Sequence, residues 1–119
     1  MDNTNKLEIL NKYIEAWNVS SDGERQELLD SSFSANGRYI DPHIPAPVAS
    51  LEEMKEIIIT FRSRLPHHLK MVDEPEFHNY AFRMKWKMEH EGQVLSTGIF
   101  VGEYDSQNKI NNVICFIDK

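Results

Sequence analysis

Cysteine is almost absent from this 119-residue chain, which holds Cys115 alone. A single cysteine excludes an internal disulfide framework and a thiolate zinc site within one chain. Cys115 also lies inside the apolar run 113–117, whereas a reactive thiol needs an electropositive and accessible setting. We therefore predict a buried structural thiol and not a nucleophile.

Long apolar runs and clusters of basic residues are missing as well. No segment is apolar and long enough to span a bilayer, and residues 1–10 lack the positive and apolar regions of a signal peptide. Thirteen Lys and Arg against nineteen Asp and Glu give a net charge of −6, with no basic block that could neutralise phosphates. We predict a cytoplasmic protein with neither nucleic acid nor a membrane as its partner.

What remains is the composition of an ordinary folded protein. Hydrophobic residues make up 40% of the chain and charged residues 27%, which is far from the composition of a disordered segment. The length suits one domain, residues 1–119, with a single shared core.

The first half of the sequence shows the 3.6-residue period of amphipathic helices. Residues 4–18 form one such pattern, and a shorter helix capped by Asp22 directs Phe33 inward. A third helix over residues 51–65 starts with a capping box and ends at Pro66.

After this point the period changes to two, which is typical of strands. Apolar and charged residues alternate over residues 82–89, and residues 91–92 form a turn. Two further strands follow over 93–104 and 110–117. The order of elements predicts an α+β domain whose helices pack on one face of a curved antiparallel sheet.

Several short strings give the chain a resemblance to a known superfamily. They are Tyr13-Ile14-Glu15-Ala16-Trp17-Asn18, Tyr39-Ile40-Asp41-Pro42, Trp86 with Gly92, and residues 110–116. In this order and spacing the chain resembles the nuclear transport factor 2-like superfamily, in its SnoaL-like and ketosteroid isomerase-like branch, over nearly its whole length. The resemblance implies a cone-shaped sheet wrapped around three N-terminal helices, with a blind apolar cavity that binds a small, mostly apolar organic ligand.

The resemblance also implies two catalytic residues. Asp41 matches the general base, and Tyr13 matches the tyrosine that stabilises the enolate oxygen in ketosteroid isomerase, the standard example of this division of roles. An apolar pocket raises the pKa of a carboxyl group by desolvation and so makes it a stronger base. The alternatives are an aspartate that forms a turn before proline, and a buried ring whose hydroxyl reaches water or backbone.

One residue departs from the isomerase pattern. Phe100 stands where those enzymes carry a second oxyanion donor, and the loss of one such donor costs about 2.7–4 kcal/mol, or a hundred- to a thousandfold in rate. A binding pocket without isomerase activity of the usual kind is therefore one possible reading. A non-catalytic interaction module that uses the outer face of the sheet is another, and an open cavity or a filled core would distinguish them.

The predicted ligand-binding residues are mostly large apolar side chains, for which the alternative is an ordinary core. They are Trp17, His43, Phe61, Phe82, Met84, Trp86, Phe100 and Phe116. His43 either assists Asp41 or is an exposed loop residue. The five histidines lack metal-ligand spacing, so we predict no metal and no cofactor.

The alternation of side chains along the strand over residues 93–104 leads to a prediction about the oligomeric state. If Phe100 faces the cavity, then Ile99 and Val101 lie on the outer face of the sheet. Exposed apolar residues on an outer face need a partner, and the resemblance also suggests a homodimer formed through this face.

Overall fold

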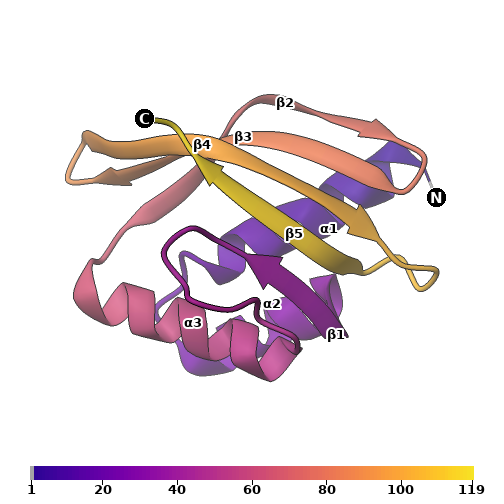
Figure 1. Cartoon of the computed structure of the whole chain (residues 1–119), viewed down its shortest axis with the longest axis horizontal. Coiled ribbons are helices and arrows are strands. Elements are labelled where there is room, and N and C mark those ends of the chain that lie inside the picture. The colour runs from indigo at the N-terminus through magenta and orange to yellow at the C-terminus, as the bar shows by residue number, and fades with distance from the viewer. Residues whose placement is uncertain (1) are drawn as a thin grey trace.

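The computed structural model describes residues 2–119. Figure 1 shows three helices beneath one face of a curved five-stranded sheet, so the predicted α+β architecture is confirmed. The elements are α1 (Asn3–Ala16), α2 (Asp22–Ser32), β1 (Phe33–Ile40), α3 (Leu51–Arg64), β2 (His68–His78), β3 (Ala81–His90), β4 (Gln93–Tyr104) and β5 (Ile110–Ile117).

The helix starts follow from local side-chain hydrogen bonds. The Ser50 hydroxyl accepts from the backbone N–H of Glu53 at 3.1 Å, as the predicted capping box requires. The cap of α2 is Ser21 and not Asp22, because the Ser21 hydroxyl accepts from Glu24 N–H at 3.3 Å. The carboxylate of Asp22 is engaged elsewhere, as an acceptor for Arg25.

The second helix ends earlier than predicted. Phe33 is the first residue of β1, with extended angles φ −116° and ψ 140°, and not the last inward residue of α2. The hydroxyls of Ser31 and Ser32 both donate to the Leu28 carbonyl, and such side-chain bonds weaken a helix end. Phe33 is nevertheless fully buried.

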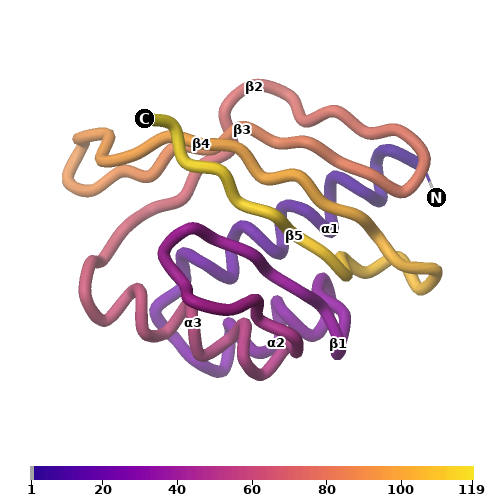
Figure 2. Tube along the Cα trace, in the orientation of Figure 1, coloured from indigo at the N-terminus to yellow at the C-terminus, as the bar shows by residue number. Residues whose placement is uncertain are grey.

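The sheet has the order β1-β5-β4-β3-β2. β2 to β5 form an antiparallel meander, of which β3, β4 and β5 were predicted and β2 was not. β1 runs parallel to β5, so the sheet is mixed and not antiparallel throughout. Figure 2 shows β1 and the loop after it lying over the helices, with β5 beside them. The sheet stays open, with β1 and β2 as its two edges.

The concave face of the sheet carries the predicted apolar alternation. Phe82, Met84 and Trp86 of β3 are all buried, and so is Phe100 of β4. Gly98 lies beneath the Trp86 ring and beside the Phe116 carbonyl of β5, and an added Cβ would collide with both. Close approach of the two strands at this point therefore requires glycine.

A buried arginine joins the first two helices. Arg25 is 2% exposed. Its Nε donates to the Ala16 carbonyl at 3.0 Å, and its Nη atoms donate to Asp22 and to the Val19 carbonyl. The guanidinium thus satisfies backbone carbonyls at the end of α1 that have no partner within the helix.

Within residues 2–119, none of the helices combines the length and the apolar character that crossing a bilayer would need.

Candidate functional site

A cavity of about 260 Å³ lies between the concave face of the sheet, helix α3, the end of α1 and the loop after β1. Most of its lining is apolar, and the polar contributors are Asp41, His43, Ser96, Cys115 and the hydroxyl-bearing Tyr39. Small-molecule sites commonly measure about 300–1,000 Å³. The cavity therefore suits a compact ligand, and its presence favours a binding pocket over a filled core.

Asp41 sits where β1 ends and the proline-containing loop begins. One carboxylate oxygen, Oδ1, accepts from the backbone N–H of His43 at 2.7 Å, which is the turn expected of an aspartate in this position. The other oxygen, Oδ2, accepts from the Tyr39 hydroxyl at 2.5 Å. The same carboxylate thus forms the turn and presents an oxygen beside the cavity.

The hydroxyl group that donates to Asp41 belongs to Tyr39. Because side chains alternate along a strand, residues two apart on β1 share one face. The Tyr39 ring is 1% exposed and packs against Trp17 at 5.7 Å and Phe100 at 6.4 Å between centroids. Burial raises the pKa of Tyr39 well above its ordinary value, so the hydroxyl keeps its proton and acts as a donor.

Tyr13, the predicted oxyanion donor, lies deeper in the core. It does not line the cavity; its ring stacks on Phe33 at 5.9 Å and meets the edge of Phe100 at 6.2 Å. Burial raises the pKa of its hydroxyl, which has no hydrogen-bond partner among the described residues. The Trp17 side chain partly offsets this rise, although the two groups do not reach hydrogen-bond geometry.

Cys115 lines the cavity beside the Asp41 end. Burial, reinforced by the nearby charge of Asp41, raises the pKa of its thiol to about 12. The predicted burial of Cys115 is confirmed.

The predicted ligand-binding residues divide into three groups. Those that line the cavity are Trp17, His43, Phe61, Trp86 and Phe100. Phe82 and Met84 are buried in the core beyond the lining. The prediction for Phe116 was wrong, because this residue is 57% exposed on the outer face, while its neighbour Cys115 points inward.

Sequence reasoning missed several lining residues. Parity on β1 could have identified Tyr39, which shares a face with Asp41. No sequence signal singled out the others, which come together from separate elements. They are Ile44, Ile57, Leu65, Leu69, Met88, Leu95, Ser96 and Ile117, together with Cys115.

Two lining residues carry unused hydrogen-bond donors. The indole N–H groups of Trp17 and Trp86 are buried, and neither finds an acceptor within residues 2–119. A buried N–H without an acceptor is costly.

Among residues 2–119 there is no cluster of three or more His, Cys, Asp or Glu side chains that could hold a metal ion.

The comparisons with known proteins show the fold. No protein-family model and no curated protein matches the sequence. Among solved structures, a SnoaL-like family protein from Agrobacterium tumefaciens strain C58, to which an isomerase activity has been attributed, superposes with a TM-score of 0.89 at 24% identity. The match covers 98% of this chain and 99% of that protein.

Two more distant structures extend the comparison. A protein from Jannaschia sp. CCS1, assigned as a SnoaL-like polyketide cyclase, gives a TM-score of 0.76 at 12% identity over 97% of this chain and 86% of its own. A de novo designed protein with a curved β-sheet gives 0.77 at 11% identity over 99% and 88%. The chain therefore has the SnoaL-like, nuclear transport factor 2-like fold, and this fold alone does not specify an activity.

Proposed function

We propose that the chain binds a compact, mostly apolar organic ligand in this cavity and that Asp41 exchanges a proton with it. The observation that supports this most directly is the polar pair formed by Asp41 Oδ2 and the Tyr39 hydroxyl at the edge of an otherwise apolar cavity. Apolar walls with a few oriented polar groups are the usual makeup of a small-molecule site.

The chemistry of the pair favours a carbonyl compound as ligand. The Asp41 carboxylate would take a proton from the carbon beside the carbonyl, and the electron pair of the C–H bond would move onto the carbonyl oxygen. Return of the proton at another carbon would complete an isomerisation. Because Phe100 replaces the acid of the isomerases, we expect slow turnover.

The test uses 2-tetralone, a compact apolar ketone with acidic C–H groups. Binding should quench the fluorescence of the two tryptophans, both of which line the cavity. Exchange of the ketone's α-protons for deuterium should be catalysed by the wild type and should fall about 10²–10⁴-fold in Asp41→Asn, while binding persists.

The chain offers a matched control in Asp105. Its Oδ1 accepts from the backbone N–H groups of Gln107 and Lys109 in a turn that does not line the cavity. Asp105→Asn therefore makes the same charge change at a similar turn and should leave both binding and exchange unchanged. Absence of saturable quenching would refute the binding site. Binding with exchange that does not depend on Asp41 would refute the acid–base role.

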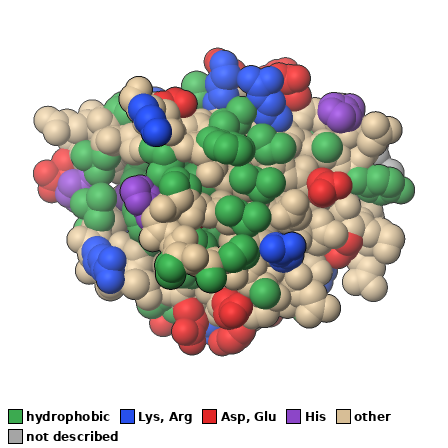
Figure 3. Space-filling model, viewed as in Figure 1, with side chains coloured by type: hydrophobic (Ala, Val, Ile, Leu, Met, Phe, Trp, Pro, Cys, Tyr) green, Lys and Arg blue, Asp and Glu red, His purple; other side chains and the backbone are tan. Residues whose placement is uncertain are grey.

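We also propose that the protein is a homodimer, paired through the outer face of the sheet. Phe116 is 57% exposed there, and Ile99 and Val101 are half-buried on the neighbouring strand. Figure 3 shows apolar side chains gathered across the middle of the face that β4 and β5 present. Such a patch supports a protein contact.

Light scattering tests the assembly. The wild type should have the mass of a dimer at tens of micromolar, and Ile99→Glu should have the mass of a monomer. Leu7→Glu is the matched control, because Leu7 is an exposed apolar residue of α1 and lies outside the sheet. A monomeric wild type would contradict the dimer. If 2-tetralone also failed to bind, a module that contacts other proteins through this face would become the better reading. A cytoplasmic location is part of this proposal.

A further inference from the structure

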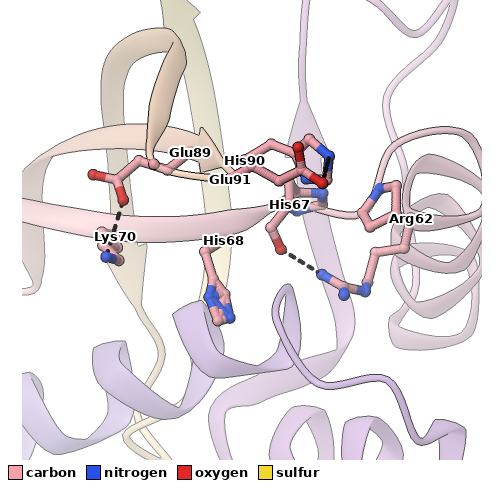
Figure 4. Close-up of a pocket in the computed structure, with 9 residues that line it drawn as sticks. Arg62, His67, His68, Lys70, Glu89, His90 and Glu91 are labelled. Atoms are coloured by element: carbon pink, nitrogen blue, oxygen red, sulfur yellow. Dashed lines mark hydrogen bonds and ion pairs between the residues drawn. The ribbon is translucent and has the colours of Figure 1, made fainter.

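A second hollow, distinct from the apolar cavity, lies where α3 ends and β2 begins, beside the β3–β4 hairpin. Its volume is about 460 Å³. Figure 4 shows Arg62 from α3, His67 from the connection to β2, and His68 and Lys70 from β2, together with Glu89, His90 and Glu91 from the β3–β4 hairpin. The two hollows have no lining residue in common. We name this one the polar groove.

Arg62 enters the polar groove with part of its guanidinium unused. Its Nη1 donates to the carbonyls of Trp17 at 2.9 Å and His67 at 2.8 Å, which fixes the position of the group. Its Nε and Nη2 have no acceptor among residues 2–119, and no carboxylate of that range pairs with it. Nε–H and Nη2–H form the side of a guanidinium that holds a carboxylate or phosphate in bidentate fashion.

His67 supplies a second group without a partner. Its side chain is 3% exposed, and its Nδ1 lies 3.0 Å from the Leu65 carbonyl. Its Nε2 is buried and has no hydrogen-bond partner in the described chain. The ring is held by an edge contact with Phe61 at 4.8 Å between centroids. A buried nitrogen without a partner is rare in a folded protein.

The acidic residues of the polar groove do not neutralise Arg62. Glu89 is engaged by Lys70 at 3.0 Å and by Lys87 at 2.9 Å, and these lysines hold the pKa of its carboxyl below the ordinary value. Glu91 has an 83% exposed side chain and lies 3.7 Å from His90 Nε2. Arg62 is therefore a cation of the groove that no carboxylate neutralises, and the highly exposed Glu91 is its carboxylate without a lysine or arginine partner.

We propose that the polar groove binds the carboxylate or phosphate group of a small organic anion, held by the free side of Arg62 beside the buried imidazole of His67. The volume exceeds what an inorganic ion needs, so an organic body has room beside the charged group.

Binding of this anion is coupled to a proton. Burial lowers the pKa of His67, and the nearby charges of Arg62 and His68 lower it further. An anion beside Arg62 cancels that repulsion and favours the protonated ring. Affinity for acetate, which stays ionised throughout this range, should therefore rise as the pH falls from 8 to 6. The other titratable groups of the groove are Lys70, Glu89, His90 and Glu91.

The experiment is a titration of ¹⁵N-labelled protein with inorganic phosphate and, separately, with acetate, against sodium chloride of equal ionic strength. We expect saturable shifts of the His67 imidazole nitrogens and of the Gly92 amide with at least one of the two anions. The anion that binds identifies phosphate or carboxylate as the recognised group. Absence of a saturable shift with both would overturn the proposal.

Two substitutions on α3 give a matched pair. Arg62→Gln should weaken binding at least about tenfold, since it removes the charged bidentate contact. Arg64→Gln makes the same charge change two residues later on an exposed side chain outside the groove and should have no effect. Equal weakening by both would show a nonspecific charge effect and refute the site. If Arg62→Gln does not fold, the His67 titration of the wild type is compared with and without acetate. A higher midpoint pH with acetate supports the site, and an unchanged midpoint refutes it. Neither anion should alter 2-tetralone binding.

Discussion

The hydrogen bond from the Tyr39 hydroxyl to Asp41 Oδ2, 2.5 Å long, offers a quantitative test of the site. Tyr39→Phe removes the hydroxyl and keeps the ring, which is 1% exposed and packed against Trp17 and Phe100. The apolar burial of the side chain is thus unchanged. The difference in the free energy of unfolding comes from the polar contact.

The magnitude follows from the charge on the acceptor. A hydrogen bond to a charged group contributes about 1.5–3 kcal/mol, and a neutral one about 0.5–1.5 kcal/mol. Tyr39→Phe should therefore cost about 2 kcal/mol in the wild type and about 1 kcal/mol when Asp41 is already Asn. The coupling energy of the double-mutant cycle should be about 1 kcal/mol.

Urea unfolding of the four proteins of this cycle measures the coupling, with the same m-value required throughout. Tyr104→Phe is the control, because the Tyr104 hydroxyl donates to the neutral Lys6 carbonyl at 2.7 Å and shares no partner with Asp41. Its cost should be the same with Asp or Asn at position 41. A coupling below about 0.3 kcal/mol between Tyr39 and Asp41 would refute the inferred contact.

Three further predictions concern stability. Arg25→Met should cost about 3–5 kcal/mol in urea unfolding, because it leaves buried backbone carbonyls and Asp22 without their donor. Gly98→Ala should cost about 1–3 kcal/mol by forcing the Trp86 ring from its place, detectable in near-ultraviolet circular dichroism. The folded pKa of His67 lies below its ordinary 6.5, so the folded state binds this proton less tightly than the unfolded state. Stability should then fall as the pH drops below 6.5; His67→Gln should remove this dependence, and His68→Gln, at an exposed position, should keep it.

Periodicity was enough to predict several elements and their faces. The 3.6-residue pattern of α3 and the two-residue alternation of β3 depend on which side chains are apolar, and the structure confirms both. Phe100 lies inside, as the resemblance implied, and strand alternation then puts Ile99 on the opposite face. Such patterns are local, so the sequence alone determines them.

Local patterns could not decide which strand pairs with β1 or which hydroxyl meets Asp41. The parallel pairing of β1 with β5 joins residues about seventy positions apart, and only the closing of the sheet brings them together. Resemblance suggested Tyr13 as the hydroxyl of the site, but packing places it behind Phe100 and puts Tyr39 beside Asp41. The polar groove likewise arises where α3, β2 and the β3–β4 hairpin meet. Its free guanidinium edge and unpartnered imidazole nitrogen are properties of three-dimensional surroundings, which no spacing in the sequence encodes.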